Sequence, residues 1–133
     1  MILVDTSALY ALADQGDPHH AEARARLHAA LEAREPLLTH NYVLVEAMAL
    51  IQHRLGLPAA LKLARSAQAF EIEWVDQSLH EEAVERLARA PRRSVSLVDQ
   101  VSFLIMRARG VTAALAFDQD FRDEGFRLYG GSG

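Results

Sequence analysis

The sequence predicts an α/β fold, a three-layer α/β/α sandwich with a central, mostly parallel sheet. Short apolar segments alternate with longer segments in which apolar residues recur at helical spacing. Two of the short segments, Ile2–Val4 and Ala113–Phe117, run directly into an aspartate. Such segments are typical of buried parallel strands that end at a polar edge of the sheet. Strands that alternate with helices indicate a parallel sheet between helical layers.

The alternation assigns the elements in order. We expect strands at about 2–4, 37–39, 70–75, 113–117 and 126–129. We expect helices at about 7–13, 18–34, 43–55, 58–69, 79–90 and 97–109. Gly56 and Gly110 each come directly after a helical segment, where glycine commonly ends a helix.

Capping residues predict where the longer helices begin. Asp17-Pro18 is typical of an N-cap followed by the first helical position. His40 or Asn41 is expected to cap the next long helix. Ser78–Glu81 has the pattern of a capping box, and Ser96–Asp99 has the same pattern with aspartate in place of glutamate.

Length and composition indicate one globular domain over residues 1–133, with 130–133 as a flexible tail. The chain is 133 residues long and half of them are hydrophobic. Cysteine is absent, so disulfides and thiolate metal sites are excluded and a cytoplasmic location is expected. No apolar run approaches the roughly 18 residues of a membrane span, so we expect no membrane partner.

The charge balance neither requires nor excludes a nucleic-acid partner. The formal net charge is −4, but it would be neutral if four acids were bound to metal ions. Lys62 is the only lysine, so almost all the bases are arginine. Arginine suits bidentate contacts with phosphate, although a GC-rich genome gives the same bias.

Four acids are expected at one edge of the sheet. Asp5 and Asp118 each follow a strand, and parallel strands bring their carboxyl ends to the same edge. Glu46 lies in the first turns of the helix after the second strand, and Asp99 lies in the first turn of its helix. Both helices begin at that edge, and Asp120 is a fifth candidate.

Each acid also has a purely structural explanation. Asp5 can cap the helix that follows it, Asp99 can complete a capping box, and Asp118 or Asp120 can cap a short helix. Glu46 can be an ordinary exposed residue of a helix. The convergence of four acids is the stronger observation, because carboxylates that share a pocket raise one another's pKa unless cations neutralise them.

A hard divalent cation fits such a cluster. Mg²⁺ and Mn²⁺ prefer oxygen ligands, whereas no histidine pair has the spacing of a zinc site. The six histidines are therefore interpreted as surface or packing residues. An all-carboxylate metal site suits phosphoryl transfer or phosphodiester hydrolysis.

The order of these motifs resembles the PIN domain, and specifically the VapC-type ribonuclease toxins of toxin–antitoxin pairs. The matching segments are ILVDTSAL at 2–9, Glu46, SLVDQ at 96–100 and AFDQDF at 116–121, and the resemblance covers essentially the whole chain. It implies a PIN-like fold and an endoribonuclease dependent on Mg²⁺ or Mn²⁺. In this sequence Val98 stands where the family commonly has threonine.

The resemblance also implies roles for particular residues. Asp5, Glu46, Asp99 and Asp118 would bind the metal and carry catalysis. Supporting roles around them would fall to Thr6, Ser7, Ser96 and Asp120, and Phe121 would pack in the core. Basic residues at the rim would bind RNA: Arg92, Arg93 and Arg122. A cognate antitoxin and a homodimer are the expected partners, through the apolar helices at 43–55 and 58–69.

Other functions on the same architecture remain open. A haloacid-dehalogenase phosphatase needs a second aspartate at the position of Ser7, and a receiver domain needs paired N-terminal acids and a late lysine. Neither pattern is present. Another metal-dependent phosphoesterase, or a non-catalytic PIN-like module that binds RNA or protein, remains an alternative.

Overall fold

The computed structural model describes residues 1–90 and 92–131, and it has the predicted α/β/α architecture. All strand pairs of the five-stranded sheet are parallel, in the order β3-β2-β1-β4-β5. The strands are β1 (Ile2–Val4), β2 (Leu37–His40), β3 (Glu71–Glu73), β4 (Ala113–Leu115) and β5 (Arg127–Leu128). The central position of β1 and β4 puts the segments that follow them side by side.

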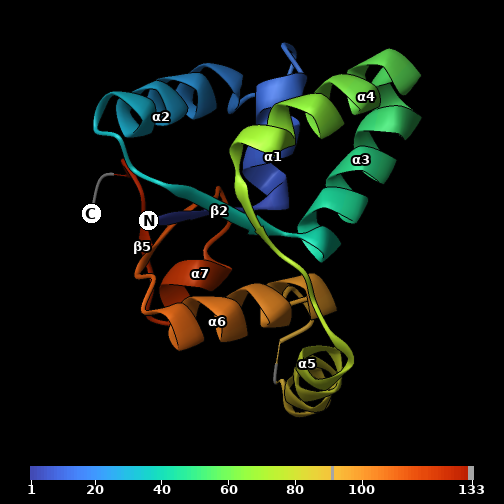
Figure 1. Cartoon of the computed structure of the whole chain (residues 1–133), viewed down its shortest axis with the longest axis vertical. Helices are drawn as coiled ribbons and strands as arrows, with labels where there is room; N and C mark the ends of the chain where they lie inside the picture. The colour runs from blue at the N-terminus through green and yellow to red at the C-terminus, as the bar shows by residue number, and fades with distance from the viewer. Residues whose placement is uncertain (91, 132–133) are drawn as a thin grey trace.

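Helices cover both faces of the sheet (Figure 1). One layer contains α1 (Thr6–Ala13), α2 (His20–Glu32), α3 (Asn41–Leu55), α4 (Leu57–Ser66) and a 3₁₀ turn (Ala67–Ala69). The other contains α5 (Gln77–Arg89), α6 (Leu97–Arg109) and α7 (Asp120–Asp123).

The strands divide the core into two halves because successive side chains point to opposite faces. Ile2 and Val4 pack on the side of α1, α2 and α3, whereas Leu3 packs on the side of α5 and α6. Phe121 is fully buried and meets Phe103 edge to face with ring centroids 5.1 Å apart. The packing role predicted for Phe121 is therefore confirmed, and burial of such a ring contributes about 1.5–3 kcal/mol.

Two helix starts differ from the prediction. The predicted start at Pro18 is wrong, because Asp17 Oδ1 accepts the backbone N–H of His19 at 2.8 Å and forms a turn, and α2 begins at His20. The predicted capping box at Ser78–Glu81 is also wrong. Asp76 caps α5 instead, with its carboxylate accepting the N–H of Leu79 at 2.8 Å.

Other boundaries follow the sequence closely. His40 caps α3 through its ring, which accepts the N–H of Val43. Both hydrogen bonds of the capping box between Ser96 and Asp99 are present at the start of α6. Gly110 ends α6 in the left-handed conformation, with φ 69°. The strands at 70–75, 113–117 and 126–129 are shorter than predicted, and the helix at 58–69 ends in the 3₁₀ turn.

No helix in the described part of the chain is both long and apolar enough to cross a membrane. Of the predicted flexible tail, residues 132–133 lie outside the described residues. The extent of the domain and the flexibility of the tail stay predictions.

Candidate active site

Three aspartates from distant segments meet at the carboxyl edge of the sheet. Asp5 follows β1 and its backbone N–H donates to the carbonyl of Leu115, the last residue of β4, at 3.0 Å. Burial, together with the nearby charges of Asp99 and Asp118, raises the pKa of Asp5 from 3.8 to about 7. The strand ends and the start of α6 therefore place three carboxylates within electrostatic reach of one another.

The other two aspartates show the same pattern. The pKa of Asp99 is raised to about 6, by burial first and then by the charges of Asp118 and Asp120, and hydrogen bonds from Ser96 oppose the rise. Burial and the charge of Asp120 raise the pKa of Asp118. Mutual destabilisation of this kind marks a cluster that lacks a compensating positive charge.

Ser7 connects the ends of the two central strands. Its hydroxyl donates to Asp5 Oδ2 at 2.8 Å and accepts the backbone N–H of Phe117 at 3.1 Å. The hydroxyl of Thr6 is buried and has no hydrogen-bond partner among the described residues. Of the two hydroxyls expected to support Asp5, the structure places only that of Ser7 in contact with it.

We expect Ser7→Ala to lower both stability and activity. The substitution leaves the N–H of Phe117 without its partner and frees Asp5 to rotate, which costs about 1–2 kcal/mol of unfolding free energy. Loss of a residue that orients a ligand lowers activity about 10- to 100-fold. Urea unfolding measures the change in stability, and an assay of the metal-dependent RNA cleavage that the sequence predicts measures the change in activity.

Thr6→Val is the matched control for that experiment. It removes the neighbouring hydroxyl, which has no partner among the described residues, and keeps the side-chain shape. Stability should therefore be unchanged or slightly higher. Equal effects of Ser7→Ala and Thr6→Val would contradict the role assigned to the Ser7 hydroxyl.

Asp120 lies between the acidic cluster and a basic rim. Its backbone N–H donates to Asp118 Oδ1 at 3.1 Å, and its buried carboxylate accepts the hydroxyl of Ser94 at 3.0 Å. Arg92 Nη2 lies 3.1 Å from the same carboxylate. Ser94 was missed by sequence analysis, because a serine in a loop 26 residues before Asp120 gives no local signal.

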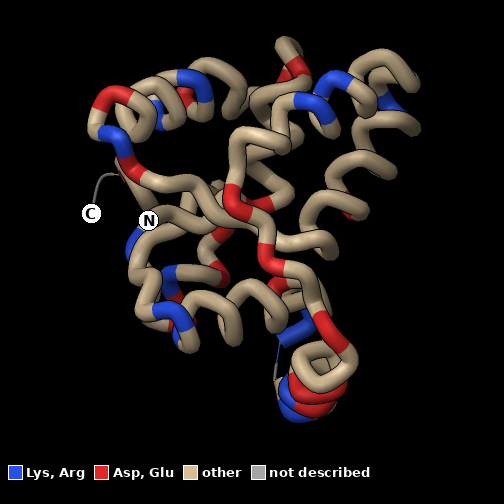
Figure 2. Tube along the Cα trace, viewed as in Figure 1, with Lys and Arg blue, Asp and Glu red and all other residues tan. Residues whose placement is uncertain are grey.

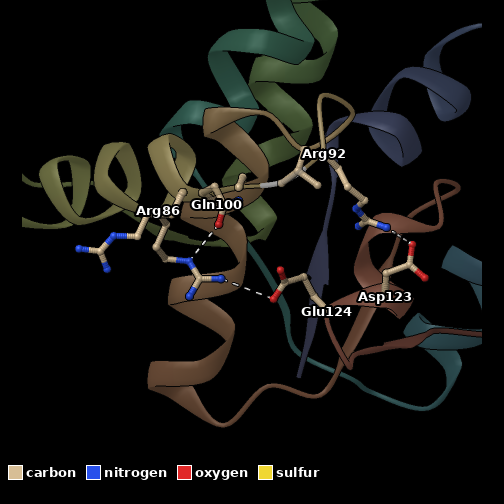
Figure 3. A pocket seen from close by; sticks show the side chains of 8 residues that line it. Arg86, Arg92, Gln100, Asp123 and Glu124 are labelled. Carbon is tan, nitrogen blue, oxygen red and sulfur yellow. Dashed lines mark hydrogen bonds and ion pairs between the residues drawn. The ribbon is translucent and has the colours of Figure 1, made fainter.

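The guanidinium of Arg92 also pairs with Asp123, beside an open cavity of about 420 Å³ (Figure 3). Arg86 lies on the same cavity and donates to Gln100 at 2.9 Å. The other two arginines predicted to bind RNA, Arg93 and Arg122, are exposed and form no ion pair with a described residue.

Glu46 differs from the three aspartates. It is exposed on α3, and it is not among the charges that shift the pKa of Asp5, Asp99 or Asp118. Within residues 1–90 and 92–131, no three acids or histidines already surround one point as ligands of a single ion. A shared cation would therefore require the side chains to draw closer.

The buried histidine has a structural role, as expected. Burial lowers the pKa of His40 to about 4, so its ring is neutral at physiological pH. Its Nδ1 accepts the N–H of Val43, and its Nε2 lies 2.8 Å from the hydroxyl of Ser102 on α6. The ring thus connects the end of β2 to the opposite helical layer.

Residues 2–126 match the PIN domain family. The chain therefore belongs to the PIN domain family, the class that its parallel sheet and clustered aspartates suggested.

Within this family, the chain is similar to VapC20 ribonucleases. The chain is 41% identical over 130 residues, 95% of each chain, to the "23S rRNA-specific endonuclease VapC20" of Mycobacterium tuberculosis strains CDC 1551 / Oshkosh and ATCC 25618 / H37Rv. A crystal structure of M. tuberculosis VapC20, described as a sarcin-ricin loop cleaving toxin, matches with a TM-score of 0.82. That match has 38% identity and covers 95% of this chain and 96% of the other. The predicted VapC-type endoribonuclease class is confirmed.

Proposed function

We propose that this chain is a metal-dependent endoribonuclease toxin that cuts 23S ribosomal RNA in the sarcin-ricin loop. The observation that carries the proposal is the cluster of Asp5, Asp99 and Asp118, whose pKa values are all raised at one edge of the sheet. The likeness to the rRNA-cutting relatives over nearly the whole chain supports the choice of substrate.

The donor set suits Mg²⁺ or Mn²⁺. Asp5 Oδ2 accepts from Ser7, Asp99 Oδ2 accepts from the N–H of Ser96, and Asp118 Oδ1 accepts from the N–H of Asp120. One oxygen of each carboxylate is thus held by the protein, and the second can serve a hard cation. Glu46 would complete the set from outside the buried cluster, through water or RNA.

A bound divalent cation supplies an activated water and neutralises charge on the phosphodiester. The protein contributes position: β1, β4 and α6 fix the three aspartates, and Ser7 and Ser96 orient two of them. Asp118, half-buried at the mouth of the cluster, can accept the proton that the attacking water releases. Hydrolysis of this kind does not use the 2′-hydroxyl, so the products carry 5′-phosphate and 3′-hydroxyl ends.

Two surface features indicate the contacts with RNA and with a protein partner: the arginines at the rim of the site and the exposed apolar residues of α3 and α4. Arg92 is held at the rim by Asp120 and Asp123, and Arg93 and Arg122 extend the basic surface for RNA phosphates. Several large apolar residues are exposed on α3 and at the start of α4: Val45, Leu55, Leu57 and Leu61. We assign this surface to the homodimer or the antitoxin. A ribosomal substrate would place the protein in the cytoplasm.

The test is cleavage of purified 23S rRNA with Mg²⁺, with Mn²⁺ and with EDTA, followed by mapping of the new ends. We expect one cut in the sarcin-ricin loop that needs the metal and leaves a 5′-phosphate. Cleavage in EDTA with 2′,3′-cyclic phosphate ends would contradict metal-dependent hydrolysis. Absence of cleavage together with absence of Mn²⁺ binding in calorimetry would favour a non-catalytic PIN-like module.

A further inference from the structure

Three side chains form a stack beside the acidic cluster. The ring of His19, at the N-cap of α2, lies on the ring of Phe117 with centroids 4.5 Å apart and planes 14° apart. The guanidinium carbon of Arg26 lies 4.9 Å from the centroid of the same ring. His19 and Arg26 are seven positions apart, about two helical turns, so both side chains can reach the one ring of Phe117.

The stack is connected directly to the proposed catalytic residues. Phe117 immediately precedes Asp118, and its backbone N–H donates to the hydroxyl of Ser7, which in turn donates to Asp5. The backbone of Phe117 is therefore joined to Asp118 by the chain and to Asp5 through the hydroxyl of Ser7, and the His19 ring stacks on the side chain of this same residue.

The inner side of the stack is buried. The side chain of Arg26 is only 12% exposed and pairs with Glu22 one turn earlier on α2. Gly130 packs against it so closely that a Cβ at this position would lie 3.0 Å from Arg26 Cγ. Phe117 thus rests on a largely buried guanidinium that pairs with Glu22 through Nη2.

The outer side of the stack faces solvent. His19 is exposed, its ring makes no capping hydrogen bond, and its backbone N–H is held by Asp17 Oδ1 at 2.8 Å. Phe117 covers one face of the imidazole, so the rest of the ring is available to a planar ligand.

We propose that His19, supported by Phe117, is a stacking platform for an unpaired base of the RNA next to the bond that is cut. The inference rests on the proposed function and deepens it, because it assigns a base-binding residue to that same site. Single-stranded loops are recognised by stacking of splayed bases on aromatic side chains, including histidine.

Trp74 is the obvious competitor, since its side chain is 71% exposed. It follows β3, which is the edge strand and is separated from β1 by β2. Acidic residues occur before and after it along the chain (Figure 2): Glu71 and Glu73 in β3, which pair with Arg109, and the exposed Asp76, which disfavours an RNA backbone there. Trp74 therefore serves as the control aromatic residue away from the site.

The experiment measures binding of a fluorescently labelled sarcin-ricin stem–loop RNA by anisotropy, in an Asp99→Asn background that prevents cleavage. We expect His19→Ala to weaken binding about 5- to 100-fold, because stacking of one base contributes this much. His19→Phe retains the aromatic face and should stay within about threefold of the parent, as should Trp74→Ala. Because His19 makes no capping bond, its removal does not threaten the fold.

A second measurement separates stacking from a merely structural effect. We prepare abasic stem–loop RNAs, each of which lacks one loop base. Binding of each RNA is measured with the parent protein, which carries Asp99→Asn alone, and with the protein that also carries His19→Ala. At the stacking position, removal of the base should weaken the parent as much as His19→Ala does, and should not weaken His19→Ala further.

The stacking platform would be overturned if His19→Ala bound the RNA as tightly as the parent, or if His19→Ala weakened binding of every abasic RNA equally. In either case, metal-dependent cleavage by the wild type would still support the proposed function. A wild-type protein that neither binds nor cuts the RNA would overturn both.

Discussion

An Asp99→Asn protein will lose at least about 10³-fold in the rate of metal-dependent RNA cleavage and will keep its fold. Asp99 is proposed as a cation ligand inside the acidic cluster, and a neutral amide binds a hard cation far more weakly than a carboxylate. A loss of 10³ corresponds to about 4 kcal/mol of transition-state stabilisation, which is within the contribution of a metal ion.

The substitution is conservative for the structure. Asp99 also accepts the N–H of Ser96 at 2.9 Å, and the carbonyl oxygen of asparagine can accept the same bond. Helix α6 therefore keeps its capping interactions. Circular dichroism and thermal unfolding verify that the fold is retained, and cleavage of a stem–loop RNA in Mg²⁺ measures the rate.

Asp76→Asn is the matched control. Asp76 caps α5 as Asp99 helps to cap α6, but it is exposed and is not among the charges that act on the cluster. The same chemical change at Asp76 should leave the cleavage rate unchanged. Equal cleavage by Asp99→Asn and wild type would point to a contaminating nuclease and contradict the proposed site.

The residues that sequence analysis brought together correctly are those whose place follows from local rules. Asp5 and Asp118 end parallel strands, and Asp99 lies in the first turn of a capped helix, so topology alone puts them at one edge. The same rule places Glu46 at this edge, but its side chain is exposed and is not among the charges that act on the three aspartates. The start of a helix fixes its edge, but exposure depends on which side of α3 packs against α1 and α4, which the local sequence leaves open.

Competing local signals explain the boundaries that were wrong. Asp76 and Ser78 are both good capping residues two positions apart. The residue before Asp76 is held by a distant contact, because the side chain of Asn41 accepts the N–H of Val75 at 2.7 Å. The contacts of Ser94 with Asp120, and of His19 with Phe117, also join segments far apart in the chain. Only the folded structure makes such pairs visible.

The metal-free protein should become more stable when Asp5 is replaced by asparagine at pH 8. In the folded chain the pKa of Asp5 is raised from 3.8 to about 7 by burial and by the charges of Asp99 and Asp118. A group with a raised pKa contributes its stability fully below its unfolded pKa, and this contribution is lost as the pH rises through about 7. Above pH 7 the ionised Asp5 therefore destabilises the fold, and Asp5→Asn removes that cost.

We expect Asp5→Asn to raise the unfolding free energy by about 2–4 kcal/mol in EDTA at pH 8, and Tm by about 5–15 °C. Asparagine also caps a helix well, so α1 should keep its N-terminus. The advantage should shrink steadily from pH 7 towards pH 4 and disappear below the unfolded pKa of 3.8, where the wild-type carboxyl is protonated in both states. Thermal unfolding of the two proteins across this range measures the difference.

Asp14→Asn is the control for the direction of the stability change, because the pKa of Asp14 is shifted the opposite way from that of Asp5. The hydroxyl of Tyr10 and the N–H of Gly16 lower the pKa of Asp14, so its contribution is present above its unfolded pKa and disappears as the pH falls. Asp14→Asn should therefore lower Tm at pH 8, opposite to Asp5→Asn.

Mg²⁺ should stabilise the wild type more than Asp5→Asn, because a cation that binds the folded cluster replaces the missing positive charge. An Asp5→Asn protein less stable than wild type at pH 8 in EDTA would show that the carboxylate is already compensated within the chain, and the case for a cation at this edge would lose its physical basis.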